Sequence, residues 1–263
     1  MLSVIIPTFN EEKRITPTLR LLCNWLEKNS FSYEVIVSDD GSDNTAEIVR
    51  EFSKKNPKVS LVKFEKRVGK GAALNRALRL VRGDALLYDA DAAVHPRFIA
   101  RALTFLNQND VVIGSRNLPL SKRLGFFPFE RRIATKLFLS VANLLFSLNV
   151  SDSQCGFKLL SKKSVENLLP LLKHSGYEWD VELLAKARMS KMLIAEIPVE
   201  WTAVRGSKMK KRSVLPMSLG ILELKAELFL QDFLSAFENV VGVSSPADND
   251  VGGVDAQGIQ LQA

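Results

Sequence analysis

The sequence predicts an α/β fold with a mostly parallel central sheet and flanking helices. Short apolar segments of strand length alternate with longer segments in which apolar residues recur at helical spacing, as in consecutive βαβ units. In the N-terminal half, the strand-like segments end in polar residues. Since open parallel sheets bind ligands beyond the carboxyl ends of their strands, this edge is the expected functional edge.

The first half of the chain contains three strand–helix units and a fourth strand. The first strand, residues 2–6, reads Leu-Ser-Val-Ile-Ile, and the helix after it, residues 17–28, has Leu19, Leu22 and Leu26 at helical spacing. The other elements predicted in this half are strands at 33–37 and 59–64, a strand ending at 89, and helices at 45–54 and 71–81.

The pattern changes after a short strand at residues 111–114. Residues 122–150 combine a basic, aromatic beginning with a long apolar helix, and residues 213–237 form a helical stretch with few charges. Further elements are predicted as strands at 156–160 and 193–200 and helices at 164–172 and 180–188. We therefore expect a main domain at 1–212, an amphipathic C-terminal region at 213–238 and a disordered tail at 239–263.

The composition points to a globular protein with an anionic partner. Of the 263 residues 46% are apolar, which is enough for a substantial core. The formal charge is +7, and because the residues after 238 hold three Asp and no Lys or Arg, the preceding body carries about +10. Such basicity suits nucleic acid, a lipid surface or a phosphorylated substrate. No nucleic-acid-binding motif is recognisable, so we expect no nucleic-acid partner.

Cysteine and histidine usage excludes several kinds of site. Cys23 and Cys155 are too few and too far apart for a disulfide framework or a Cys/His zinc site, and they fit a reducing compartment. No signal peptide is expected before the first strand. The longest charge-free stretch near the middle, residues 137–151, has 15 residues, short of the ~20 that span a bilayer. A soluble or membrane-surface protein is therefore expected.

Two carboxylates one residue apart, Asp89 and Asp91, follow the fourth strand. Side chains in extended chain alternate faces, so acids at this spacing can share one face just beyond a strand end. Like charges held so close repel unless a cation lies between them, and Mg²⁺ or Mn²⁺ suits oxygen ligands shared with substrate phosphates. For an isolated Asp-x-Asp, two exposed loop acids would be the better interpretation.

Other polar groups lie at the same predicted edge. Asp39 and Asp40 end the second strand, where we expect Asp40 to shape the turn and Asp39 to reach a nucleobase; an Asx-type turn alone is the alternative. Arg116 follows the strand at 111–114 and presents a planar fork suited to phosphate. Asp180 starts a predicted helix, where a helix-capping role is a serious alternative to a chemical one.

Two glycine-containing segments are rich in cations. Gly69-Lys70-Gly71 lacks the third glycine of a dinucleotide fingerprint and the Lys-Ser/Thr end of a P-loop, so both of those nucleotide-binding classes are poor interpretations. We expect its glycines to bring Lys70 and its basic neighbours close to a ligand, with a plain helix N-terminus about as probable. Residues 205–212 hold five cations in eight positions, which suits either a solvated charge run or a clamp for a diphosphate.

Residues 122–150 and 213–237 also have the composition of interfacial helices. Basic amphipathic segments of this kind can lie in a membrane surface. Core helices or a dimer interface explain the same pattern about as well.

The order of these motifs resembles that of the family 2 glycosyltransferases, which have the GT-A fold, a Rossmann-like arrangement. Within that family the chain is most similar to the dolichyl-phosphate β-glucosyltransferases and the related mannose synthases. The resemblance covers roughly residues 2–212 and rests on the segments at 7–12, 38–42, 67–71, 89–91, 114–116, 152–160, 179–184 and 206–208.

The resemblance implies roles for individual residues. The nucleotide and its diphosphate would be bound by Pro7, Phe9, Glu11, Asp39, Lys70, Asp89 and Ala90. Asp89 and Asp91 would hold the diphosphate through Mg²⁺ or Mn²⁺, and the residues facing phosphates or acting in transfer would be Asp91, Arg116, Arg131 and Lys208. The mannose synthases have a polar metal-binding residue where this chain has Ala93; the glucosyl-type enzymes have a small residue there.

The implied reaction is inverting transfer of a hexose, most directly glucose from UDP-glucose, to a polyprenyl (dolichyl) phosphate. The protein would lie peripherally on the cytoplasmic face of a membrane. A phosphate monoester has a second pKa of about 6, so this acceptor needs no strong general base. The alternatives are GDP-mannose or UDP-N-acetylglucosamine as donor, or a hydroxyl acceptor with Asp180 as the base.

Overall fold

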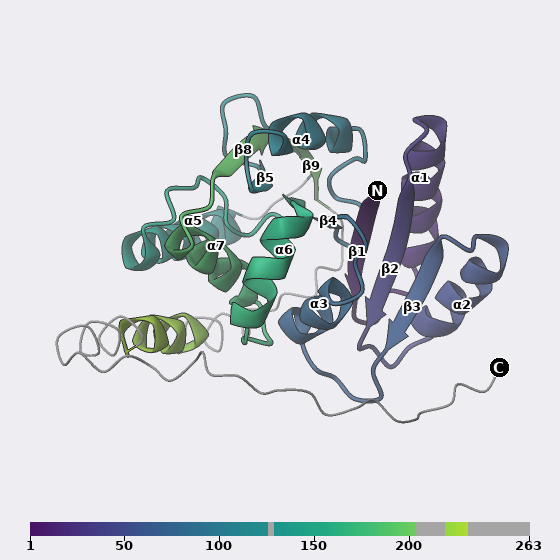
Figure 1. The fold of residues 1–263 in the computed structure, drawn as a ribbon, viewed down its shortest axis with the longest axis horizontal. Helices are drawn as coiled ribbons and strands as arrows, with labels where there is room; N and C mark the ends of the chain where they lie inside the picture. Colours follow the sequence, from purple (N-terminus) through teal and green to yellow (C-terminus); the bar gives the residue numbers. More distant parts are fainter. Residues whose placement is uncertain (126–128, 204–218, 231–263) are drawn as a thin grey trace, which may run out of the picture. The chain divides into compact units, whose positions relative to one another are not determined.

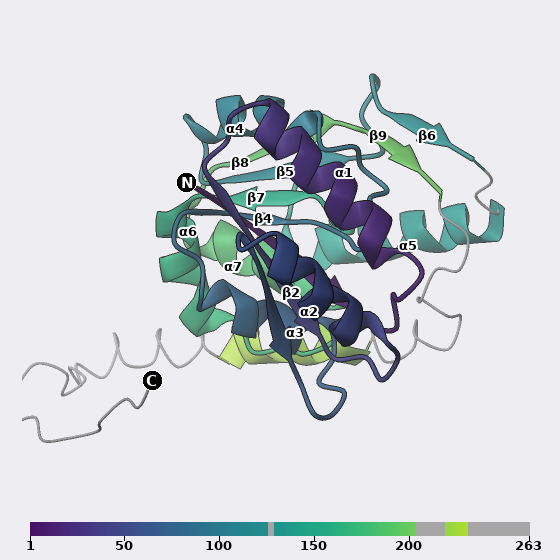
Figure 2. The same cartoon turned by 90° about the vertical axis from the view of Figure 1, so that its right-hand side faces the viewer.

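The computed structural model of the chain describes residues 1–125, 129–203 and 219–230. The chain divides into two compact units, residues 1–225 and 226–263. The first unit contains a seven-stranded sheet whose two faces are covered by helices, with α1 and α2 on one face and α6 and α7 on the other (Figures 1 and 2). The helices of this unit are α1 (Ile15–Lys28), α2 (Thr45–Lys55), α3 (Lys70–Leu78), α4 (Phe98–Leu106), α5 (Phe129–Phe146), α6 (Lys162–Leu168), the 3-10 helix η1 (Leu169–Leu171) and α7 (Trp179–Met189).

The sheet has the strand order β3-β2-β1-β4-β7-β5-β8. Its strands are β1 (Leu2–Thr8), β2 (Tyr33–Asp39), β3 (Val59–Lys63), β4 (Asp84–Leu87), β5 (Val111–Ser115), β7 (Lys158–Leu160) and β8 (Ile194–Pro198). All neighbours are parallel except β7, which is antiparallel to both β4 and β5. The predicted α/β fold with a mostly parallel sheet is confirmed. A second sheet pairs β6 (Lys122–Leu124) with β9 (Glu200–Thr202) in parallel.

The central strands are buried on both faces. Val4, Ile5 and Ile6 of β1 are fully buried, and so are Val35 and Val37 of β2. A parallel strand covered by helices on both sides requires apolar residues at successive positions, which explains the continuous apolar runs in the sequence. The register pairs Thr8 with Asp39. The polar residues that follow β1 and β2 therefore meet at one edge.

Several predicted elements differ from the observed ones. Helix α4 and strand β6 are absent from the prediction. The segment predicted as one strand at 193–200 forms two strands in different sheets, which separate at Val199. The helix predicted at 164–172 ends early, because the chain tightens into the 3-10 helix η1, which contains Pro170.

Helix α5 and the helix at 219–230 each carry several strongly exposed apolar residues. Leu137 and Leu144 of α5 are 64% and 83% exposed. Residues 219–230 are helical, as predicted for that part of the C-terminal region, and expose Leu222. The rest of the predicted helix and the predicted tail at 239–263 lie outside the described residues. None of the helices in the described part of the chain combines the length and hydrophobicity needed to span a bilayer.

Candidate active site

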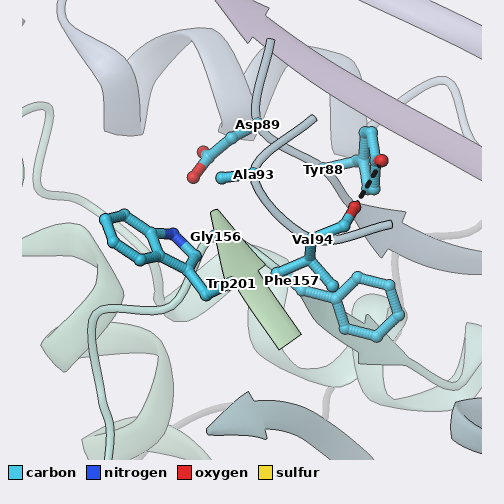
Figure 3. A pocket seen from close by; sticks show the side chains of 7 residues that line it. All are labelled: Tyr88, Asp89, Ala93, Val94, Gly156, Phe157 and Trp201. Atoms are coloured by element: carbon cyan, nitrogen blue, oxygen red, sulfur yellow. Dashed lines mark hydrogen bonds between the residues drawn. The ribbon is translucent and has the colours of Figure 1, made fainter. Parts of the chain in front are cut away.

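Asp89 and Asp91 lie in a tight turn directly after β4. The Ala92 amide donates to the Asp89 carbonyl at 3.1 Å, and the Ala93 amide donates to Asp91 Oδ1 at 3.1 Å. Ala92 has φ 49°, which reverses the chain within this turn. Asp89 lines a small pocket, shown in Figure 3, together with Tyr88, Ala93, Val94, Gly156, Phe157 and Trp201. The turn thus places an acid from the β4 edge beside the two residues that precede β7 and beside Trp201 of β9.

The two carboxylates are close enough to affect each other. Burial and the neighbouring Asp89 carboxylate raise the pKa of Asp91 to about 6. A paired set of carboxylate oxygens of this kind suits Mg²⁺ or Mn²⁺. In residues 1–125, 129–203 and 219–230, no group of three or more Asp, Glu, His or Cys gathers into a further metal site. The donor set therefore fits an ion that takes its remaining ligands from substrate phosphates and water.

The absence of a side chain at Gly156 makes room for the Asp89 carboxylate. A Cβ atom at this position would lie 1.9 Å from Asp89 Oδ2 and 2.1 Å from its Cγ. The carboxylate consequently packs directly against the backbone that leads into β7. Sequence reasoning placed Gly156 at the start of the strand predicted at 156–160 but gave it no role, because the contact joins residues 67 positions apart.

The two acids that follow one another at the end of β2 hold different segments of the chain. Asp39 is fully buried; it accepts from Thr8 Oγ1 and Lys63 Nζ, each at 2.8 Å, and from the Gly41 amide at 3.2 Å. Asp40 instead accepts from two backbone amides of the loop before α3, with Gly69 at 2.7 Å. The prediction that Asp40 shapes the turn is therefore wrong: Asp39 closes it, and Asp40 anchors the neighbouring loop.

The predicted nucleotide-pocket residues of the first loop lie at the same edge. Pro7 belongs to β1, and the ring of Phe9 lies 4.3 Å below the Arg67 guanidinium. Glu11 is buried and forms an ion pair with Arg14 at 2.7 Å.

Ala90 is buried between the two acids of the β4 turn. Its carbonyl accepts from Thr18 Oγ1 at 2.7 Å, which ties the turn to α1. The structure thus brings Pro7, Phe9, Asp39 and the Asp89–Asp91 turn together along one edge of the sheet.

Lys70, the first residue of α3, contacts an acid 110 positions away. Its Nζ donates to Asp180 Oδ2 at 2.8 Å, and Lys158 Nζ donates to Asp180 Oδ1 at 2.6 Å. Burial raises the pKa of Asp180, but the charges of Lys158 and Lys70 outweigh it, so the pKa is lowered. The Asp180 side chain does not cap α7, and a carboxylate held by two lysines is a poor proton acceptor. Sequence reasoning did not identify Lys158, although a single lysine within an otherwise apolar strand could have indicated a buried ion pair.

Gly69 and Gly71, at the start of α3, lie against a neighbouring segment of the chain. The Gly71 amide donates to the Ser175 carbonyl at 2.7 Å, and a Cβ on Gly69 would lie 2.4 Å from that oxygen. The segment that supplies Ser175 is held by Glu182, which accepts from the His174 amide at 3.0 Å. These glycines therefore make room for a neighbouring segment of the chain, and the expectation that they bring Lys70 close to a ligand stays a prediction.

Arg116 forms an ion pair with Asp152. Its Nε and Nη2 donate to the two carboxylate oxygens at 2.6 and 2.8 Å, and its backbone amide donates at 3.0 Å. Glu196 accepts from the Asp152 amide at 3.2 Å and so fixes the acid in place. The predicted phosphate contact of Arg116 would use Nη1 and the second N–H of Nη2, since the Nε and Nη2 donors that face Asp152 are occupied.

We expect Asp152→Asn to destabilise the fold by about 3 kcal/mol, because breaking a buried ion pair leaves Arg116 without its charge partner. Burial raises the pKa of Asp152, but the Arg116 guanidinium lowers it below the ordinary value. The stabilisation is therefore present above the ordinary pKa of about 4 and is lost as the pH falls through the lower folded value. Urea unfolding at pH 7 and pH 3 measures both effects. Glu34→Gln, which removes a charge facing the exposed Arg82, should cost under about 1 kcal/mol.

Two predicted phosphate ligands cannot be placed. Arg131 belongs to α5, but its side chain lies outside the described part of the structure, and Lys208 lies outside the described residues altogether.

Comparisons with known proteins identify the family of the chain. The sequence profile of "Glycosyl transferase family 2" matches residues 3–169. A dolichyl-phosphate beta-glucosyltransferase of Trichomonas vaginalis, ALG5C, is 33% identical over 243 residues, covering 84% of this chain and 69% of that protein. The Homo sapiens dolichyl-phosphate beta-glucosyltransferase is 33% identical over 224 residues, covering 79% and 69%.

The fold also matches a solved enzyme. Glucosyl-3-phosphoglycerate synthase of Mycobacterium tuberculosis, in complex with UDP, superposes with a TM-score of 0.64 at 19% identity, covering 86% of this chain and 79% of that one. Another structure of that enzyme, holding Mn²⁺ and UDP with glucosyl-3-phosphoglycerate, gives a TM-score of 0.60 at 20% identity, covering 85% and 78%. With the α/β sheet and the acids at its carboxyl edge, these matches show that the chain is a GT-A glycosyltransferase that belongs to glycosyltransferase family 2.

Proposed function

We propose that the protein transfers glucose from UDP-glucose to a polyprenyl phosphate, with inversion at the anomeric carbon. The choice of acceptor rests on the hydrogen bonds and the pKa of Asp180. This acid, the candidate base for a hydroxyl acceptor, is bonded to two lysines and has a lowered pKa. A phosphate acceptor needs no such base, since its oxygens are largely ionised at neutral pH. The relatives named as dolichyl-phosphate beta-glucosyltransferases support the same choice.

In the proposed reaction, an acceptor phosphate oxygen forms a bond to the anomeric carbon while the bond from that carbon to the UDP oxygen breaks on the opposite face. No proton has to be removed. The protein contributes position and charge: Pro7, Phe9, Glu11 and Asp39 would line the nucleotide site, and Lys70 would face the diphosphate. Arg131, Lys208 and the remaining donor group of Arg116 would face phosphates.

Asp89 and Asp91 would hold Mg²⁺ or Mn²⁺, with Ala90 between them in the turn. Bound there, the ion would neutralise charge on the diphosphate. The absence of a side chain at Gly156 lets the Asp89 carboxylate lie in this position, and a solved fold neighbour holds Mn²⁺ with UDP.

The acceptor would be reached at the cytoplasmic face of a membrane, with the protein bound peripherally. The exposed Leu137 and Leu144 of α5 support this, since an apolar helix face beside a basic segment suits a lipid surface. The exposed Leu222 in the helix at 219–230 supports it independently.

The test is transfer of radiolabel from UDP-glucose to dolichyl phosphate in detergent micelles, with and without Mn²⁺. We expect an organic-extractable product that forms only with the divalent cation. Parallel reactions with GDP-mannose and UDP-N-acetylglucosamine test the donor, and a hydroxylated lipid tests the acceptor. Preferential transfer from another donor, or to the hydroxyl, would replace this proposal with the corresponding alternative.

A further inference from the structure

Lys158 is a charged residue in the centre of the sheet. It lies on β7 between β4 and β5 and is 0% exposed. Its Nζ donates to Asp180 Oδ1 at 2.6 Å and to the Cys155 carbonyl at 2.7 Å. Burying a charge costs several kcal/mol unless close partners compensate. Because the side chain is inaccessible to any substrate, its effect on the reaction must pass through other residues.

Asp180 connects Lys158 to the reaction edge. One carboxylate oxygen bonds Lys158 and the other bonds Lys70, at 2.6 and 2.8 Å. Side-chain exposure rises along this row, from 0% at Lys158 through 3% at Asp180 to 20% at Lys70. The three side chains therefore connect the core of the sheet to Lys70, which is the member of this set that a ligand can contact.

The charges along the row alternate and leave an excess of one positive charge. If Asp180 were paired with Lys70 alone, the two charges would largely cancel. With Lys158 as a second partner, the carboxylate is already compensated, and Lys70 keeps its positive charge for other groups. The Asp89 carboxylate is close enough to Lys70 for their charges to interact. The excess charge therefore lies near Asp89, one of the two acids expected to hold the donor's diphosphate through the metal.

We propose that Lys158 is a positioning residue for glycosyl transfer, which compensates Asp180 and thereby directs the charge of Lys70 to the diphosphate of the donor. This inference rests on the proposed function. Negative charge grows on the leaving diphosphate as the glycosidic bond breaks, so a cation fixed in advance stabilises the transition state more than the bound donor. Loss of Lys158 should therefore lower kcat more than it changes KM.

The experiment is a double-mutant cycle of Lys158→Met and Lys70→Met in the full-length protein, assayed with UDP-glucose, Mn²⁺ and dolichyl phosphate. Lys158→Met alone should lower kcat by about tenfold and change the KM for UDP-glucose by less than about twofold. In the Lys70→Met background, Lys158→Met should have no further effect, because its action requires Lys70. Lys186→Met is the matched control: it also replaces a buried lysine, in the last turn of α7, and should leave kcat unchanged.

The outcomes separate this inference from its alternatives. Removing one partner of a buried ion pair destabilises a fold, but in Lys158→Met the Asp180 carboxylate keeps Lys70 as its partner. Lys158→Gln, which keeps donors but not the charge, serves if Lys158→Met does not fold. For a folded variant, unchanged kcat, or an equal loss in both backgrounds, would overturn the inference. A wild-type protein without transfer activity would instead contradict the proposed function.

Discussion

Replacing Asp91 by Asn is expected to reduce transfer roughly a thousandfold and, without metal, to make the protein more stable. Asp91 is partly buried, and Asp89 is near enough for the two negative charges to interact. Asn keeps the shape and an oxygen that can accept from the Ala93 amide, but it removes one of the two like charges. The activity falls because a neutral amide is a much weaker ligand for Mg²⁺ or Mn²⁺ than a carboxylate.

Asp91→Asn also removes the repulsion between the Asp89 and Asp91 carboxylates, which is present in the metal-free protein. We expect the free energy of unfolding to rise by about 1 kcal/mol in EDTA. In Mn²⁺ with UDP the wild type should gain more stability than the variant, because ligands that bind only the folded state stabilise it. Differential scanning calorimetry with and without Mn²⁺ and UDP measures both quantities.

Asp84→Asn is the matched control for Asp91. Asp84 begins β4, at the end of that strand opposite to the acidic turn, and accepts from the Lys162 amide at 2.9 Å. Its replacement should leave kcat and the Mn²⁺ dependence unchanged. Wild-type transfer activity in Asp91→Asn would contradict the assignment of the metal site. Full activity of the wild-type protein without any divalent cation would contradict it as well.

The features that could be predicted from sequence are those encoded locally. The apolar runs of β1 and β2 and the polar residues after them predicted the sheet and its functional edge, because burial on both faces leaves a continuous signal. The sequence also predicted that Asp89 and Asp91 lie together just beyond the fourth strand, because residues only two positions apart stay close whatever the rest of the fold.

The ion pairs of the site are not local, and sequence reasoning did not find them. Asp180 meets Lys70 across 110 positions, and Arg116 meets Asp152 across 36. An isolated acid at a helix start or an arginine after a strand has several possible partners, and only the folded chain selects among them. The antiparallel direction of β7 escaped prediction similarly, because a three-residue strand carries no pattern that reports its direction.

Gly156→Ala is expected to lower transfer by at least about a hundredfold while costing only about 1–2 kcal/mol of stability. The three atoms nearest to the added Cβ all belong to the Asp89 carboxylate, at 1.9 to 2.3 Å. This side chain can rotate away, so the fold tolerates the methyl group. Rotation, however, takes the carboxylate from the position in which it would bind the metal beside Asp91. Steady-state kinetics over a range of Mn²⁺ concentrations should show a lower kcat and weaker activation by Mn²⁺.

The double variant Gly156→Ala/Asp89→Ala distinguishes this local displacement from general damage. If the Asp89 carboxylate alone meets the methyl group, its removal should return the melting temperature to that of Asp89→Ala, and transfer should stay absent. If stability is not recovered, the added atom disturbs the backbone before β7 instead. Retention of wild-type kcat and Mn²⁺ activation by Gly156→Ala would show that the Asp89 position in this structure is not the one used in transfer. In that case the metal would have to be held by Asp91 in a different arrangement.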